Sequence, residues 1–150
     1  MAERHDTDTD MGLLPDLMGF NLRCAQVAVF QHFNRTLGTR DISPPQLGAL
    51  VLISANPGIS QSAVAGALRF DRSTLVQIID RLEDRGLVVR EVSATDRRSH
   101  ALQMTESGAV LLEELKVLTA SHEDHMARRL SAEERQTLIR LLQRVYDTDG

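Results

Sequence analysis

The sequence predicts a mainly α-helical protein with a single small β-hairpin. Over most of the chain, apolar residues recur at steps of three and four, which is the period of an amphipathic helix. Residues 87–104 differ, because two short apolar runs there flank a polar loop, as in an antiparallel hairpin. A length of 150 residues corresponds to about one domain, so we expect residues 1–150 to form a single subunit.

The N-terminal part of the chain predicts a tail followed by a long helix. Residues 1–11 are polar and acidic, have no apolar period and are expected to be a disordered tail. A helix is predicted over residues 13–37, and apolar side chains cover so much of its circumference that more than one partner must pack on it. We therefore assign residues 12–40 to dimerisation.

The central lobe, residues 43–104, is predicted to begin with a helix. Ser43 is a suitable N-cap residue, and Pro44 and Pro45 fit the first helical turn after it. The apolar period continues until Asn56-Pro57-Gly58, a sequence that ends helices.

Two shorter helices and a hairpin complete this lobe. Ser60 caps the first helix, in which Ala63, Val64 and Ala67 are expected to face inward. The second helix ends at Gly86, where a left-handed conformation causes no Cβ clash. The segments are, in order, a helix over residues 61–68, a break at 69–71, a helix over about 72–85, and strands at 87–92 and 99–104. Helix, break, helix and hairpin form the order of a winged helix-turn-helix.

Residues 105–147 predict two further amphipathic helices. Thr105 caps the first, and Ser131 forms a capping box with Glu134 at the start of the second. The outer helices carry more apolar surface than the central lobe needs for its own core, and symmetric dimers are the commonest way to bury such surface. The sequence therefore predicts a homodimer with N- and C-terminal dimerisation helices.

The charge of the chain does not decide whether nucleic acid is a partner. The formal net charge is −4, but 16 of the 17 basic residues are Arg and only Lys116 is Lys. Arginine forms bidentate bonds with phosphate and guanine, whereas lysine is a point charge. A GC-rich genome would produce the same bias.

Composition excludes several classes of protein. The single cysteine, Cys24, excludes intramolecular disulfides and a Cys-rich zinc site. The longest apolar run, residues 47–53, is interrupted by Gly48 and is too short to span a membrane. The acidic N-terminus is unlike a secretory signal, so a cytoplasmic protein is expected. The chain lacks a Ser/His/Asp constellation and a Gly-rich phosphate loop, so we expect neither an enzyme nor a bound cofactor.

Three stretches of the chain are distinctive in their order and spacing. They are Ser73-Thr74-Leu75 through Asp80-Arg81-Leu82-Glu83-Asp84-Arg85-Gly86-Leu87-Val88, then Asp96-Arg97-Arg98, then Leu102-Gln103-Met104-Thr105-Glu106-Ser107-Gly108. Together they resemble the MarR family of bacterial transcription regulators, and the resemblance covers about residues 13–145. It implies a homodimer with interlocked terminal helices, two winged helix-turn-helix lobes, a repressor that responds to a small molecule, and no catalysis.

The second helix of the helix-turn-helix is expected to contact DNA, because a recognition helix presents its N-terminal, solvent-facing residues to base edges in the major groove. These residues are Arg72, Ser73, Thr74 and Gln77, with Arg81 one turn further along. Gln77 suits adenine, and Arg72 suits guanine or phosphate. The chain departs from the MarR pattern at Gln77, where many members carry Arg, and at Val76, where many carry Thr. The alternative for these polar residues is an ordinary solvated helix face.

Two flanking sites are also expected to contact DNA. Ser60 and Gln61 begin a helix, where their side chains and the backbone amides suit a phosphate. Arg97 and Arg98 lie in the hairpin loop and suit a narrow minor groove, whose negative potential attracts arginine. In the MarR pattern, Asp96 braces this loop and Arg98 enters the groove.

The resemblance also implies a small-molecule effector bound between the dimerisation helices and the DNA-binding lobes. In this chain the candidate residues are Arg23, Phe30, His32 and Phe33. Residues 17–30 resemble the subgroup that responds to aromatic acids or their coenzyme A thioesters. The alternative is that Phe30 and Phe33 belong to the dimer core.

Three other functions remain as alternatives. Cys24 would make a redox-responsive regulator if partners lowered the pKa of its thiol, but we predict a buried structural cysteine. His122 and His125, with Cys24 or His32, would make a zinc-responsive regulator, but we favour a solvated helix face and no metal site. The third alternative is a winged-helix module that binds a protein and does not read DNA.

Overall fold

The computed structural model describes residues 9–92 and 100–147. Its elements, in chain order, are η1 Leu14–Asp16, α1 Met18–Thr36, η2 Leu37–Arg40, α2 Pro44–Ala55, β1 Ile59–Ser60, α3 Gln61–Leu68, α4 Arg72–Asp84, β2 Val88–Val92, β3 His100–Met104, α5 Glu106–Met126 and α6 Ala132–Tyr146. The predicted class is confirmed: the chain is mostly helical, and its strands form a small antiparallel sheet. No helix of the described residues is long and apolar enough to cross a bilayer.

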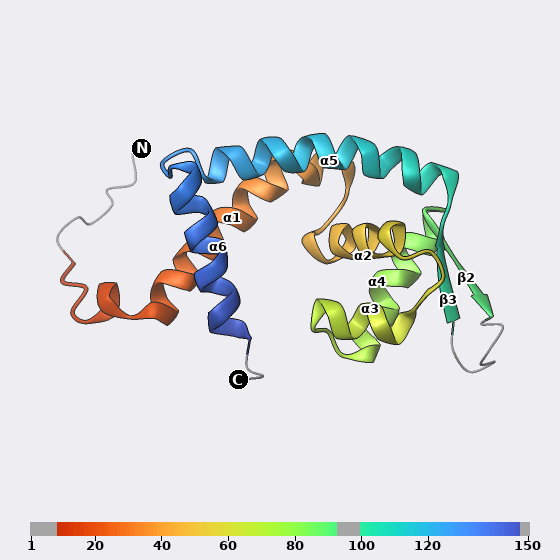
Figure 1. The fold of residues 1–150 in the computed structure, drawn as a ribbon, viewed down its shortest axis with the longest axis horizontal. Helices are drawn as coiled ribbons and strands as arrows, with labels where there is room; N and C mark the ends of the chain where they lie inside the picture. The colour runs from red at the N-terminus through yellow and green to blue at the C-terminus, as the bar shows by residue number, and fades with distance from the viewer. Residues whose placement is uncertain (1–8, 93–99, 148–150) are drawn as a thin grey trace.

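The long helix α5 connects two parts of the molecule (Figure 1). At its N-terminal end lie α2, α3, α4 and the sheet, which together form the winged helix-turn-helix lobe. At its C-terminal end lie α1 and α6. Arg135 of α6 forms ion pairs with Glu123 and Asp124 of α5, at 3.6 and 3.1 Å, and so joins the last two helices.

The sheet has three strands, in the order β1-β3-β2, and not the two of the predicted hairpin. The hairpin itself is present, with Val88 opposite Met104 and Val92 opposite His100. The additional strand is β1, in which Ile59 pairs with Leu102. The amide of Gly58, just before it, donates to the carbonyl oxygen of Leu102 at 2.9 Å. Two residues are too few for an alternating pattern, so the sequence does not reveal this strand.

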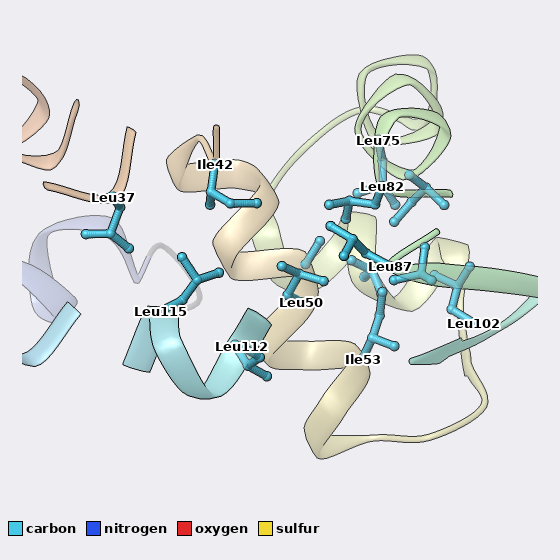
Figure 2. Close-up of a cluster of buried hydrophobic side chains, with 14 of the residues drawn as sticks. Leu37, Ile42, Leu50, Ile53, Leu75, Leu82, Leu87, Leu102, Leu112 and Leu115 are labelled. Carbon is cyan, nitrogen blue, oxygen red and sulfur yellow. The ribbon is translucent and has the colours of Figure 1, made fainter. Parts of the chain in front are cut away.

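The hydrophobic core lies where α2, α4, the sheet and the start of α5 meet (Figure 2). Its fully buried side chains include Leu37, Leu50, Ile53, Val64, Leu75, Ile79, Leu82, Val88, Leu102, Leu112 and Leu115. In α3 the inward residues are Val64 and Ala65, whereas Ala63 and Ala67 are exposed. The prediction for Ala63 and Ala67 is therefore wrong, because the buried face of α3 centres on Val64.

The predicted caps are confirmed at four helix starts. The side chains of Ser43, Ser60, Thr105 and Ser131 each accept a hydrogen bond from a backbone amide in the first turn. The first long helix is shorter than the predicted range of residues 13–37. Pro15 lies in η1, and Leu17 is extended, so α1 begins at Met18.

The two outer helices expose much of their apolar surface. No residue of α6 is buried, and only Phe33 of α1 is. The exposed apolar side chains of these two helices are Met18, Val27, Val29, Phe30, Leu138, Ile139, Leu141, Val145 and Tyr146. Exposed apolar side chains in such number on two helices are typical of an interface.

Candidate nucleic-acid interface

Helices α3 and α4 form the helix-turn-helix, and local hydrogen bonds fix the start of α4. Arg69 takes a left-handed conformation in the turn, with φ of 59°. Asp71 caps α4: its carboxylate accepts from the amide of Thr74 at 2.7 Å and from the hydroxyl of Ser73 at 2.8 Å. The bond from the Thr74 amide, with that from Ser73, holds the pKa of Asp71 below its usual value. The Asp71 carboxylate therefore satisfies one of the free backbone amides in the first turn of α4.

Helix α4 has one buried face and one exposed face. Leu75, Ile79 and Leu82 are buried in the core. On the other side Arg72, Ser73, Val76 and Gln77 are exposed, and Thr74 is half-buried. The structure thus brings the expected residues of the first turns of α4 onto one accessible face. Whether they touch DNA stays a prediction.

At the expected phosphate site at the start of α3, the side-chain oxygens of Ser60 and Gln61 already accept hydrogen bonds from within the chain. The hydroxyl oxygen of Ser60 accepts from the amide of Ala63 at 3.1 Å. The side-chain oxygen of Gln61 accepts from Nε of Arg90 at 2.9 Å. Arg72 reaches across from α4, and its Nη2 donates to the hydroxyl of Ser62 at 3.3 Å. The starts of the two helices are therefore linked through their side chains.

Arg90, on β2, is absent from the expected site residues, yet it contacts both helices. Its guanidinium forms ion pairs with Asp80 and Glu83 of α4 as well as the bond to Gln61. A signal is present in the sequence: an arginine inside an apolar strand, shortly after a helix with acidic residues, has to find partners. The spacing alone does not say which acidic residues face it.

Arg81 lies in a different environment from the start of α4. It lines an open cleft of about 620 Å³ together with Asn34, Asp41, Gln46, Asp84 and Arg85. Arg85 lies along one side of this cleft, where its guanidinium donates to the carbonyl oxygens of Asp41 and Arg40 at 2.6 and 3.1 Å. Asp96, Arg97 and Arg98 lie outside the described residues, between the ends of β2 and β3.

The four candidate effector residues lie on two sides of α1. Arg23 and Phe30 are exposed, and their spacing of seven residues places them on the same face of the helix. His32 and Phe33 face α5: Phe33 is buried and meets the ring of His122 edge-on. Within one chain the structure therefore does not bring all four together. Their role in binding an effector stays a prediction.

Three histidines form a cluster between α1 and α5. Nδ1 of His32 lies 2.7 Å from Nδ1 of His122, and the ring of His125 stacks on His32 with centroids 4.0 Å apart. His122 is only 2% exposed, so it does not belong to a solvated helix face as predicted. Burial lowers the pKa of His122, and His32 lowers it further. Desolvation also lowers the pKa of His125, as do the nearby charges of His32, Arg128 and Arg35.

The structure also bears on the redox and metal alternatives. Cys24 is exposed on α1, so the prediction of a buried cysteine is wrong for the single chain. Within the described ranges, no three His, Cys, Asp or Glu side chains are arranged to hold a metal ion.

Known proteins resemble the chain in both sequence and structure. A sequence model of the MarR family matches residues 40–99. A putative transcriptional regulatory protein for the hcr operon of Thauera aromatica is 42% identical over 140 residues, which cover 93% of this chain and 84% of that protein. The transcriptional repressor CouR bound to a 23-mer DNA duplex matches with a TM-score of 0.89 and 37% identity, over 93% of this chain and 99% of CouR. CouR bound to p-coumaroyl-CoA matches with a TM-score of 0.86 and 34% identity, over 94% and 99% of the two chains.

These similarities agree with the architecture. The order of helices, the small antiparallel sheet and the exposed N-terminal face of α4 are those of a winged helix-turn-helix between long terminal helices. The sequence similarity extends over nearly the whole chain and not only over the lobe. The chain belongs to the MarR family of DNA-binding transcriptional regulators.

Proposed function

We propose that this regulator is a homodimeric repressor that binds a pseudo-palindromic operator and is released by a small aromatic acid or its coenzyme A thioester. The observation that carries the DNA-binding part is the exposed polar face at the start of α4, which is held by the Asp71 cap and by the burial of Leu75 and Ile79 in the hydrophobic core. Similarity over nearly the full length to CouR bound to a DNA duplex supports it. Dimer symmetry places the two recognition helices about one helical turn of DNA apart.

The homodimer is supported by the apolar side chains that the single chain leaves exposed. Val117 on α5 is 71% exposed, Val27 on α1 44% and Leu141 on α6 45%. Water contact with so many apolar side chains is unfavourable, and a second copy of the same helices buries them on both sides.

The proposed effector is supported by CouR bound to p-coumaroyl-CoA and by the side chains that α1 exposes. Phe30 offers an aromatic surface to a phenolic ring, and Arg23 on the same face offers a cation to a carboxylate or phosphate. An effector releases DNA only if it binds more tightly to the dimer spacing that does not fit the operator.

Fluorescence anisotropy with labelled DNA from upstream of the regulator's own gene tests this function. We expect binding that weakens steeply between about 50 and 200 mM salt. Contacts with phosphates release counterions from the DNA, and this release is less favourable when the salt concentration is higher. p-Coumaroyl-CoA should displace the DNA, and coenzyme A alone should not.

Variants of α1 separate effector binding from DNA binding. Phe30→Ala should still bind DNA but should need more p-coumaroyl-CoA for release, whereas Met18→Ala, an exposed apolar truncation on the same helix, should respond like wild type. Absence of DNA binding by a folded dimer would favour the protein-binding module. DNA binding unaffected by aromatic acids and their thioesters would leave a DNA-binding regulator with another type of effector.

A further inference from the structure

Arg90 occupies the junction of the sheet, the recognition helix and the helix before it. It lies in the middle of β2, and its side chain is only 16% exposed although it carries a full charge. A charged side chain with so little access to water needs hydrogen-bond partners on several sides.

Every nitrogen of the Arg90 guanidinium has such a partner. Nη2 donates to Asp80 at 2.6 Å and to the carbonyl oxygen of Val76 at 3.3 Å, and Nη1 donates to Glu83 at 3.2 Å. Nε donates to the side-chain oxygen of Gln61 at 2.9 Å. The backbone amide of Arg90 also donates to Glu83, at 3.1 Å. One residue thus connects β2 to α4 by four bonds and to α3 by one.

The bond to Gln61 determines which end of its amide group is available to DNA. Arginine only donates hydrogen bonds, so the oxygen of Gln61 must face Arg90 and the NH2 group must point away. An NH2 group donates, and a phosphate oxygen accepts. Arg90 therefore holds Gln61 in the orientation that suits a phosphate.

We propose that Arg90 is a positioning residue for DNA recognition, which fixes the wing strand β2, the recognition helix α4 and the Gln61 amide relative to one another. The proposal rests on the proposed DNA-binding function and adds how the lobe keeps its reading surface rigid. Asp80 and Glu83 act with it, as the anchors on α4 that hold the guanidinium in place. Rigid placement of contacting groups favours binding because less order has to be imposed when the complex forms.

Neutralising the acidic anchors separates this role from a simple effect of charge. If only charge mattered, Asp80→Asn and Glu83→Gln would strengthen DNA binding, because each removes a negative charge near the phosphates. If Arg90 positions the lobe, both variants should weaken operator binding by about two- to thirtyfold, the range of indirect couplings. Asp84→Asn is the matched control: it makes the same change in charge on α4, at a residue for which the described part of the chain shows no ion pair.

The affinity of each variant for the operator is compared with its affinity for a scrambled DNA duplex of equal length. The positioning role predicts that Asp80→Asn and Glu83→Gln lower the ratio of operator to scrambled affinity while the melting temperature stays close to wild type. Arg90→Lys should behave in the same way, since lysine keeps the charge but lacks the fork of donors. A merely structural role would lower both affinities in proportion to the loss of folded protein.

Hydrogen exchange gives a second readout that does not need DNA. In Glu83→Gln and Arg90→Lys, amides of residues 88–92 should exchange faster than in Asp84→Asn, because the strand is no longer held to α4. The proposal is overturned if the anchor variants bind the operator as tightly as Asp84→Asn, or if exchange in the strand does not change. Failure of wild type to bind DNA would instead overturn the proposed function, and the role of Arg90 in recognition with it.

Discussion

The histidine cluster predicts that single residues make the stability of this protein depend on pH. His32 and His122 face each other through their Nδ1 atoms, so one ring donates the proton that the other accepts. Protonation of both rings would place two donors against each other. The groups that surround the cluster are Arg35 on α1 and Glu123 and Arg128 beyond it, and among these only Glu123 favours the charged form of His122.

Folding stability should therefore fall as the pH drops from about 7 to about 5. The pKa of His122 is lowered in the folded chain, whereas in the unfolded chain histidine keeps a pKa of about 6.5, so the unfolded state binds more protons in this range. Urea denaturation at several pH values measures the effect. His122→Asn should reduce the slope of stability against pH, and His100→Asn, at an exposed position on β3, should not. Equal slopes for wild type and His122→Asn would contradict this explanation.

Gln77 allows a test of base recognition at one residue. It is exposed on the face of α4 that we propose to read DNA, and a glutamine there can pair bidentately with adenine. Gln77→Ala should lower operator affinity by about 1–3 kcal/mol and relax the preference at one base pair of each half-site. Binding measurements on operators with single-base changes check this. Equal loss on every sequence would mean that Gln77 contacts only the backbone.

At the scale of elements, the start of α5 is tied to the end of β3 and to the turn after α4. The hydroxyl of Thr105 donates to the carbonyl oxygen of Gly86 at 2.6 Å and accepts from the amide of Gly108 at 3.0 Å. A Cβ atom at Gly108 would collide with the carbonyl oxygen of Leu87 and approach the sulfur of Met104. The helix that links the two parts of the molecule is thus packed directly against the DNA-binding lobe.

Gly108→Ala should lower the free energy of unfolding by about 1–3 kcal/mol, because the added methyl group forces this packing apart. Gly66→Ala is the matched control, since a Cβ atom at this helical glycine meets nothing within 4 Å. That change should raise stability by about 0.5–1 kcal/mol through the lower entropy of the unfolded chain. Chemical denaturation measures both, and equal effects would contradict the packing argument.

The elements also show what the sequence could and could not predict. Ser43, Ser60, Thr105 and Ser131 were predictable as caps because a cap depends on neighbours a few residues away. Strand β1 was not, because only its pairing with β3 makes it a strand. The burial of His122 and the contacts of Arg90 likewise depend on residues distant in sequence, at His32 and Gln61.

The apolar faces of α1 and α6 support the proposal that a second copy of the chain packs on the first. Leu138, Leu141 and Val145 recur at steps of three and four on α6, and all three are at least 45% exposed. No residue of α6 is buried, so the hydrophobic core of the single chain does not cover them. A second copy is the partner that the proposed dimer supplies.

Leu141→Glu should therefore dissociate the proposed dimer. A carboxylate placed within an apolar interface costs about 3 kcal/mol or more, so the dissociation constant should rise at least a hundredfold. Gln143→Glu adds the same charge on the other side of α6, at an exposed position, and should leave the dimer intact. Sedimentation velocity distinguishes the two species. A wild-type protein that sediments as a monomer at micromolar concentration would contradict the dimer.

The most direct test of a dimeric regulator that reads DNA is a footprint on the DNA upstream of its own gene, at about 50 and about 200 mM salt. We predict protection of two symmetric half-sites whose centres lie about one helical turn apart, with weaker protection at the higher salt. A folded dimer that protects no sequence at the lower salt would show that the exposed face of α4 does not read this DNA.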